Sequence, residues 1–453
     1  MRKLLVINAV ALTEKLISDK TPNLKYYLDK SKSYLTPPIP AVTMSSQASI
    51  MSGKPVSEHG IVANGWYFRD LAQVWLWRQP DSLIQADNFW DKIKAADPSF
   101  KVAKMFWWFN MYSSADISVT PRPVYRADGV KIPDAYTQPA SLNDELKERF
   151  GSFPLFKFWG PMTSVESTQW ITDSSCYVME KEQPNLTMVY LPHLDYNLQR
   201  LGPNHSDIEA DMIELDGQIA QLRACAEKND YDVVILSEYG IQEVSRPIHI
   251  NRVLRKNDFI DIRIECGEEH FDAGASRAFA VADHQVAHVY VEKDEDIEAV
   301  ANLLKKEPGI AEVLVGDERA KYAQDHERSG EIVCLAEKDA WFTYYYWLDD
   351  AKAPDYARSV DIHRKPGYDP VELFLVPGGK LKAAFTLLKK KLGMRYLMNV
   401  IPLDADLVKG SHGVHCASNA EGPLLIGDLN FAEGSVQPME NCAELFTNYF
   451  MAD

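Results

Sequence analysis

The hydroxyl side chain of Thr43 follows an extended Pro-Ala-Val segment and precedes a short run of small residues that ends at Gly53. A strand, a hydroxyl residue and a helix in this order put the hydroxyl at a helix N-terminus. Unpaired backbone N–H groups and the positive end of the helix dipole favour an anion there and help an alkoxide to form. Thr43 is therefore a candidate nucleophile. The alternative is that it is an ordinary helix N-cap, a common role for threonine.

A second block of chemically active side chains, VDIHRKPGYDP, spans residues 360–370. Asp361 and His363 stand two apart, so on an extended stretch they would face the same side and could bind a metal. Arg364 and Lys365 follow directly and could hold a phosphate group. The alternative for this block is a surface ion pair or a capped turn. Asp-His also occurs in the segment ADHQ at 282–285, with the same two alternatives.

Continuous apolar runs predict the strands that would position these residues. They lie at 4–7, 101–109, 186–191 and 232–236. Residues 206–228 carry apolar side chains at helical spacing between the last two runs. Strand, helix and strand in this order indicate a parallel sheet, whose ligands bind beyond the carboxyl ends of the strands. Residues 8–12, 43, 192–199 and 237–240 therefore merit attention.

A smaller unit interrupts this pattern. Residues 288–315 read as a strand, a charged helix and a further strand. We expect a small βαβ, lid-like subdomain at 285–330, inserted in a core made of 1–284 and 331–453. The aromatic run WFTYYYWLDD at 341–350 is expected mostly to fill the core.

The composition is that of a globular protein: 453 residues, 46% hydrophobic and 25% charged. A formal net charge of −17 argues against nucleic-acid binding, which requires a basic footprint. The six cysteines are scattered without a CxxC pair, as in a reduced protein. We expect a cytoplasmic protein with no membrane span. The short apolar run near the N-terminus is predicted to be a strand, the alternative being a signal peptide. The oligomeric state is left open.

The block from Pro40 to Phe68, PAVTMSSQASIMSGKPVSEHGIVANGWYF, resembles the nucleophile region of the type I phosphodiesterase/nucleotide pyrophosphatase family of the alkaline phosphatase superfamily. The resemblance implies an α/β fold: an alkaline phosphatase-like three-layer sandwich around a mostly parallel sheet, with a small α+β lid subdomain. It implies that Thr43 attacks phosphorus and that Asn64 binds a phosphate oxygen. The adjoining Trp66 and Tyr67 become candidates for substrate contact, with core packing as the alternative.

The same resemblance implies two divalent metals, usually zinc, held by Asp and His side chains. For one metal, Asp195 matches the Asp of a D-x-x-x-H motif, and His412 matches the Gly-x-His-Gly ligand. The His position of the first motif is Gln199.

For the second metal, Val10 stands where an Asp is expected, and Glu238-Tyr239 replaces an Asp-His pair. Three interpretations follow. The centre is rebuilt, with Asp361 and His363 as replacement ligands; or it is reduced to one metal such as Mn²⁺ or Mg²⁺; or it is lost. The expected number of metals is therefore zero to two, with zinc favoured.

The leading functional hypothesis is a metal-dependent hydrolase of phosphodiester or related phosphate-ester bonds, acting on a small molecule, possibly a nucleotide. Thr43 and Asn64 would be catalytic, and the metal ligands would be Asp195, His412 and Glu238. A non-catalytic or metal-poor binding protein on the same fold is the alternative. Hydrolysis of a phosphonate or sulfate ester is a further one.

Overall fold

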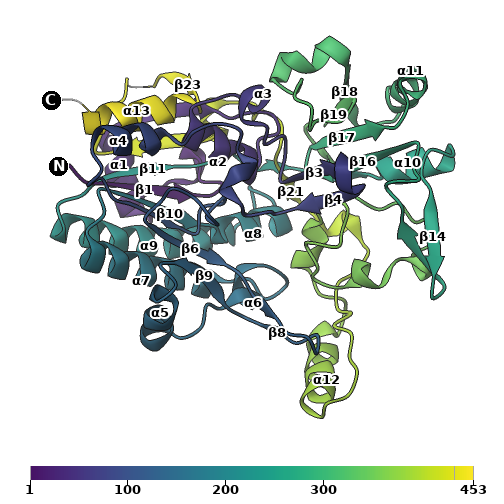
Figure 1. Ribbon diagram of the computed structural model, residues 1–453, viewed down its shortest axis with the longest axis horizontal. Coiled ribbons are helices and arrows are strands. Elements are labelled where there is room, and N and C mark those ends of the chain that lie inside the picture. The colour runs from purple at the N-terminus through teal and green to yellow at the C-terminus, as the bar shows by residue number, and fades with distance from the viewer. Residues whose placement is uncertain (1, 433, 452–453) are drawn as a thin grey trace.

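The computed structural model describes residues 2–432 and 434–451 (Figure 1). Its centre is a nine-stranded sheet in the order β23-β2-β22-β11-β1-β10-β5-β6-β9. The strands of this sheet are β1 (Leu4–Ala9), β2 (Lys32–Thr36), β5 (Val102–Met105), β6 (Ile117–Pro121), β9 (Ala135–Gln138), β10 (Leu186–Leu191), β11 (Asp232–Leu236), β22 (Leu424–Gly427) and β23 (Val436–Pro438).

The middle of the sheet is parallel, as the sequence predicts. β1 lies between β10 and β11 and is parallel to both, and β10, β5 and β6 continue in the same direction. Antiparallel pairs occur towards both edges, where β22 joins β11 and β9 joins β6. Every residue of β1 and β10 is buried, which explains their continuous apolar sequences.

Helices cover both faces of the sheet, which gives three layers (Figure 1). α7, α8 and α1 pack against α9 on one face, and α13 packs against α2 and α4 on the other. The helices are α1 (Pro22–Lys30), α2 (Thr43–Ser52), α3 (Val56–His59), α4 (Phe89–Ala96), α5 (Leu142–Phe150), α6 (Leu155–Phe158), α7 (Val165–Glu182), α8 (His193–Leu201), α9 (Ile208–Lys228), α10 (Ile250–Lys256), α11 (Asp294–Leu304), α12 (Gly379–Lys391) and α13 (Asn441–Met451).

A second, four-stranded sheet has the order β16-β17-β19-β18, with every neighbouring pair antiparallel. Its strands are β16 (Ala278–Asp283), β17 (Val286–Val291), β18 (Ile310–Val315) and β19 (Ile332–Ala336). β17, α11 and β18 form the expected strand-helix-strand unit, but β19 is inserted between the two strands. The sheet therefore uses strands on both sides of 285–330, because the apolar run at 332–336 also needs burial.

Short two-stranded pairs complete the fold. They are β3 (Gly65–Phe68) with β4 (Gln73–Leu76), β7 (Val124–Tyr125) with β8 (Lys131–Ile132), β12 (Gln242–Glu243) with β21 (Gly410–Ser411), β13 (Arg246–Ile248) with β20 (Ala340–Phe342), and β14 (Ile262–Glu265) with β15 (Glu268–Phe271). The aromatic run at 341–347 is buried, as expected. Within residues 2–432 and 434–451, no helix is both long and apolar enough to cross a membrane.

Candidate active site

Thr43 is the first residue of α2, where its side chain is almost fully buried. The preceding residue, Val42, is extended, so the chain passes from a strand-like segment into the helix at this hydroxyl. Asn64 secures the turn, because its Oδ1 accepts a hydrogen bond from the Met44 N–H at 3.0 Å. One of the N–H groups that α2 cannot satisfy internally is thus already paired.

Asn64 is itself held by Asp283, at the end of β16. The Asn64 backbone N–H donates to Asp283 Oδ2 at 2.8 Å, and its Nδ2 donates to Asp283 Oδ1 at 3.1 Å. Nδ2 carries two hydrogens, so one remains for a ligand. Asp283 thus links the small sheet to the start of α2. The sequence analysis considered Asp283 as a metal ligand paired with His284, whereas here it holds Asn64.

Glu238, two residues after β11, packs against α2. The Thr43 hydroxyl is one of the neighbours that lower the pKa of the Glu238 carboxyl, against the larger effect of burial. Glu238 Oε1 accepts from Asn8 Nδ2 at 2.5 Å and from Gln47 Nε2 at 2.6 Å, whereas Oε2 has no hydrogen-bond partner by geometry. Gln47 escaped the sequence analysis. Its spacing of four residues from Thr43 puts both on one helix face and could have revealed it.

Asp195 and Gln199 lie one turn apart on α8 and are joined by a hydrogen bond from Gln199 Nε2 to Asp195 Oδ2 of 2.6 Å. The Tyr239 hydroxyl donates to Asp195 Oδ1 at 3.2 Å. The Tyr368 hydroxyl donates to Gln199 Oε1 at 3.0 Å. Both oxygens of Asp195 are therefore occupied by protein donors.

His412 follows β21 and lies in a stack of four rings. Its ring centroid is 3.5 Å from that of Tyr239 and 3.6 Å from that of His284, and the His284 ring lies 3.8 Å from Tyr368. His412 Nδ1 bonds the Ala41 carbonyl at 2.7 Å, two residues before Thr43. His412 Nε2 has no partner, although it is buried. The stack joins the Asp195 group to the segment that presents Thr43.

Burial controls the charges of this cluster. It raises the pKa of Asp195 and of Asp283 to about 7 and that of Glu238 to about 8. Burial also lowers the pKa of His412 to about 3 and that of His284 well below its usual value. Near neutral pH, both imidazoles are uncharged and Glu238 is mostly protonated.

The donor set does not fit the two-zinc centre that the resemblance implies. Among residues 2–432 and 434–451, no group of three or more His, Cys, Asp or Glu side chains is arranged to hold a metal ion. Gln199 and Tyr239 stand at ligand positions and donate hydrogen bonds to Asp195. Asn8 and Gln47 likewise donate hydrogen bonds to Glu238. The carboxylates thus receive protein N–H and O–H groups where a metal ion would otherwise balance them.

Of the block at 360–370, Tyr368 joins this cluster, whereas Asp361, Arg364 and Lys365 have other partners. The expected extended stretch around Asp361 and His363 is a series of turns, so the two side chains do not share a strand face. The Asp361 N–H donates to Glu372 at 2.9 Å, and Arg364 is exposed and paired with Asp355 at 2.6 Å. Loop backbone conformation, which residue spacing alone does not determine, accounts for the difference.

Lys365, also expected to hold a phosphate, is fully buried. Its ammonium forms ion pairs of 2.7 Å with Asp369 and 2.6 Å with Glu372. Burial is the largest single effect and lowers the pKa of Lys365. The two carboxylates together outweigh it, so the pKa is raised above its usual value. The positive charge is therefore already balanced inside the protein.

The aromatic residues near Asn64 pack against the small sheet. Trp66 stacks on Phe68 at 5.0 Å, and the Tyr67 ring packs edge-on against Phe279 and Tyr290 at 5.0 and 5.4 Å. These contacts correspond to the packing alternative for Trp66 and Tyr67.

A different aromatic group lies beside the cluster. Trp77 and Trp108 are half-buried with ring centroids 5.0 Å apart, and Trp77 is 6.1 Å from Tyr368. The backbone N–H of Trp108 donates to Gln47 Oε1 at 2.7 Å, which connects this pair to the face of α2 that carries Thr43. Trp77 also lines a small cavity with Trp159 and Tyr368. Tryptophan is too common in cores for the sequence to single out this pair.

The chain was compared with models of known protein families and with known proteins. The model of the type I phosphodiesterase/nucleotide pyrophosphatase family matches residues 4–369. The chain belongs to this family. A curated relative, a pyrophosphatase/phosphodiesterase of Schizosaccharomyces pombe described as uncharacterised, is 20% identical over 276 residues, or 58% of this chain. The chain spans about half the length of that relative, since the match covers 49% of it.

Solved structures share the fold. Murine ectonucleotide pyrophosphatase/phosphodiesterase 5 has a TM-score of 0.57 and 13% identity, with 99% of this chain and 95% of that chain covered. Phosphonoacetate hydrolase from Sinorhizobium meliloti 1021, in complex with phosphonoformate, has a TM-score of 0.62 and 11% identity, covering 99% and 96%. Both likenesses agree with the mostly parallel sheet and the flanking helix layers. The fold expected from the sequence is confirmed.

Proposed function

We propose that this chain hydrolyses a small phosphate ester and that Thr43 is the nucleophile. The observation that supports the proposal most directly is the position of Thr43 at the start of α2, the helix whose Gln47 holds the buried Glu238 carboxyl at 2.6 Å and leaves its Oε2 without a hydrogen-bond partner. Membership of the family agrees with it. The start of α2 and the remaining Nδ2 hydrogen of Asn64 supply N–H groups for phosphate oxygens.

In this scheme the chain's own residues move the first proton. Ionised Glu238 accepts the Thr43 proton on Oε2 as Oγ attacks phosphorus, the bond from phosphorus to the leaving oxygen breaks, and the alkoxide or phenolate so released takes a proton from water. A water molecule then hydrolyses the Thr43 ester, which restores the hydroxyl and releases the phosphate monoester. A base with a pKa of about 8 suits this step, because it binds the proton more strongly than an ordinary carboxylate does. Turnover should therefore rise as the pH approaches 8.

The half-buried Trp77 and Trp108 suggest the kind of leaving group. A flat ring could stack on either indole beside Gln47. A structure of murine ectonucleotide pyrophosphatase/phosphodiesterase 5 is in complex with AMP, and one of phosphonoacetate hydrolase is in complex with phosphonoacetate. Aryl and nucleoside phosphodiesters and phosphonoacetate are thus the first candidates to test.

A second candidate function is binding without turnover. The observation that favours it is the replacement of metal ligands by hydrogen-bond donors at Gln199 and Tyr239. Low charge near neutral pH would let an anion approach even without a metal. On this hypothesis the protein binds a phosphate ester reversibly, and Thr43 only contributes a hydrogen bond.

The test measures release of 4-nitrophenol from bis(4-nitrophenyl) phosphate by wild type, Thr43→Ala, Thr43→Ser and Glu238→Gln. We expect Thr43→Ala to abolish turnover, Thr43→Ser to retain part of it, and Glu238→Gln to lower kcat about 100-fold by removing the proton acceptor. A covalent phosphoryl adduct, found by intact-protein mass spectrometry on quenched samples, should disappear in Thr43→Ala.

Full activity in Thr43→Ala would refute the nucleophile. If wild type shows no turnover of aryl or nucleoside phosphodiesters or of phosphonoacetate, yet titration calorimetry detects binding of AMP that Asn64→Ala weakens, the binding function replaces the hydrolase.

A further inference from the structure

The apolar face of helix α12 points away from the protein. Leu381, Phe385, Leu388 and Leu392, at i, i+4, i+7 and i+11, fall on one side of the helix, with exposed fractions of 80%, 59%, 51% and 66%. On an ordinary surface helix such a stripe faces the core. Here the buried positions of the helix are the small Gly379 and the polar Thr386 instead.

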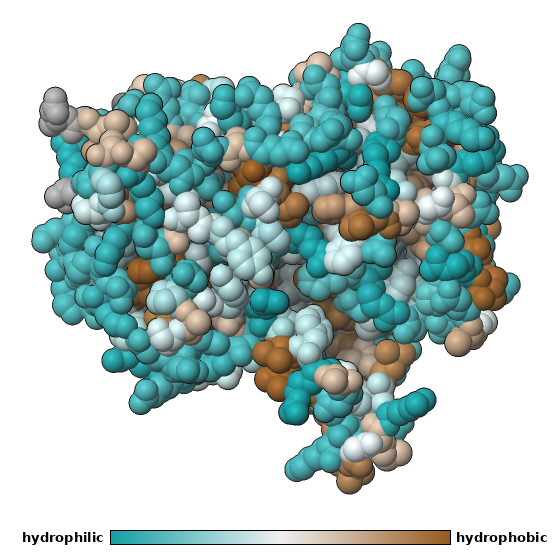
Figure 2. All heavy atoms as spheres, in the orientation of Figure 1, coloured by the Kyte–Doolittle hydropathy of each residue, from teal (hydrophilic) through white to brown (hydrophobic). Residues whose placement is uncertain are grey.

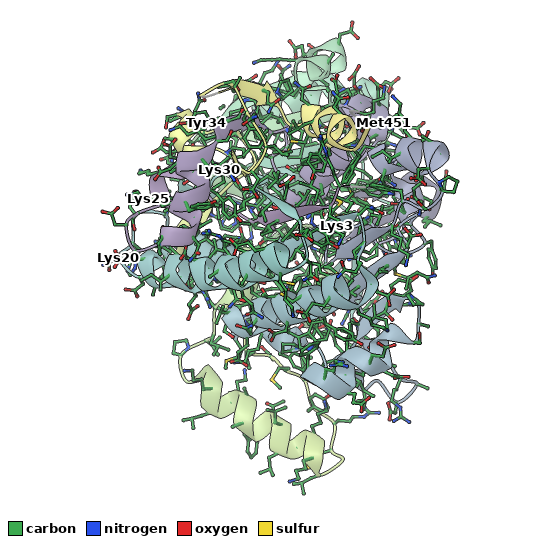
Figure 3. The ribbon with its side chains drawn as sticks, turned by 90° about the vertical axis from the view of Figure 1, so that its left-hand side faces the viewer. Lys3, Lys20, Lys25, Lys30, Tyr34 and Met451 are labelled. Carbon is green, nitrogen blue, oxygen red and sulfur yellow. The ribbon has the colours of Figure 1, made fainter. Side chains whose placement is uncertain are left out.

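The helix belongs to an excursion that leaves the body and returns to the same point. The Val376 N–H donates to the Val400 carbonyl at 2.9 Å, which closes the base of the excursion at 377–399. Figures 1 and 3 both show α12 projecting beyond the rest of the molecule. Beyond the helix, Met394 and Leu397 are also exposed, at about half of their surface.

The charge of the excursion is opposite to that of the whole chain. Residues 377–399 contain six basic side chains and no acidic one, whereas the chain has a net charge of −17. Viewed down the helix, the basic residues flank the apolar stripe on both sides. Lys380 and Lys391 lie on one flank, and Lys382 and Lys389 on the other.

We propose that α12 docks the protein reversibly on an anionic phospholipid membrane. The leucine and phenylalanine stripe would enter the boundary between headgroups and acyl chains, while the flanking lysines would contact lipid phosphates and carboxylates. A strongly charged helix with a continuous apolar face is the form that binds in the plane of such an interface. Basic clusters add affinity for acidic lipids.

Other occupants fit the excursion less well. A nucleic acid would satisfy the lysines but would leave four large apolar side chains in water. A second copy of this chain offers acidic groups, but the face seen in Figure 2 is mainly hydrophilic, with small, scattered apolar patches. A lipid surface offers negative charge and an apolar layer together.

The experiment measures cosedimentation of the full-length protein with vesicles of phosphatidylcholine alone and of phosphatidylcholine with phosphatidylserine in about a 2:1 ratio. We expect binding to the mixed vesicles, and affinity about ten-fold lower for phosphatidylcholine alone, since the lysines then have no acidic lipid to contact. The triple variant Leu381→Ser/Phe385→Ser/Leu388→Ser should lose binding to both, and raised salt should weaken the binding of wild type.

A matched control replaces three other exposed apolar side chains, in Leu71→Ser/Ile213→Ser/Ile264→Ser, and should bind like wild type. Absence of wild-type binding to either vesicle would overturn the proposal, as would equal binding by the two triple variants. The helix would instead bind a second copy of the chain if three results coincided. Wild type would not bind vesicles, light scattering would show it to be a dimer, and the α12 triple variant would be a monomer. Thermal unfolding is measured for every variant. Because the substituted side chains lie at the surface, each variant should keep the fold and unfold near the wild-type temperature.

Discussion

At the residue scale, the cluster around Thr43 keeps its carboxyl groups and balances them with hydrogen-bond donors. Asp195 is bonded by Gln199 and Tyr239, and Glu238 by Asn8 and Gln47. A metal ion would have to displace such donors and would then gain few ligands. The replacements at Gln199 and Tyr239 thus form one consistent arrangement, because each donates to the same carboxyl group.

This arrangement predicts that a single substitution will create zinc affinity. Gln199→His would add an imidazole beside Asp195 and near His412, giving the three protein ligands that a zinc site with an open position uses. Elemental mass spectrometry on protein purified without chelator should find less than about one zinc in wild type and about one in the variant. Gln199→Leu is the control, since it also removes the amide but adds no ligand. Stoichiometric zinc, manganese or magnesium in wild type would contradict the argument.

A second prediction concerns Asp283 and pH. Its pKa is about 7 in the folded protein, against an ordinary value of 3.8, because it is buried. Between these values the folded state holds a proton that the unfolded chain has released, so stability falls as the pH rises towards 7. Relative to Asp283→Asn, wild type should lose up to about 1.4 kcal/mol of unfolding free energy per pH unit in this range.

Urea unfolding at pH 5, 6, 7 and 8 measures this difference. Buried histidines such as His59 and His412 contribute equally to both proteins and cancel. Above pH 7 the difference should become constant, and a constant difference from pH 5 onwards would show that Asp283 is ionised throughout.

At the element scale, α8 and β21 must approach closely to bring Asp195 and His412 together. Gly410 makes this possible: a Cβ there would lie 2.1 Å from the Leu198 carbonyl oxygen and 2.7 Å from Ile241 Cγ2. The Leu198 carbonyl is part of the backbone of α8, so it cannot move aside as the end of a flexible side chain could. The glycine in the Gly-x-His-Gly motif therefore serves the packing of α8 against the histidine segment.

Gly410→Ala should accordingly destabilise the protein by about 1–3 kcal/mol or more, the range for overpacked sites. Gly217→Ala is the matched control. It lies within α9 with no atom within 4 Å of the added Cβ, and should be stabilising by about 0.5–1 kcal/mol. Differential scanning calorimetry compares the two, and an unchanged Tm for Gly410→Ala would show that α8 and β21 can separate freely.

Elements with strong periodicity could be predicted from the sequence, and those defined by distant partners could not. The runs of β1, β10 and β11 are buried on both faces, and α9 carries a clear helical stripe, so local pattern was sufficient. β19 was missed as part of the small sheet, since its neighbours are set by tertiary pairing. The motif predicted Thr43 and Asn64 as site residues, and the structure brings them together at the start of α2, whereas Gln47 and the ring stack depend on side-chain contacts between remote segments.

At the scale of the whole molecule, two regions of opposite character coexist. The layered body carries the acidic surface and the buried cluster, and the excursion at 377–399 carries a basic, apolar helix outside it. The segment at 362–372 lines the small cavity beside Trp77 and Tyr368, and the chain continues from it into the excursion. Contact with a membrane would thus take place on an extension of the chain that borders this aromatic group.

The central sheet also constrains how the chain folds during its synthesis. β22 lies between β2 and β11, although it is made long after both of them. Until the ribosome releases residues 424–427, the open edge of β11 stays unpaired, and α2 lacks its packing partner α13. Long-range pairing of this kind slows folding. Until then the nascent chain exposes an unpaired strand edge, the kind of feature that chaperones shield from aggregation.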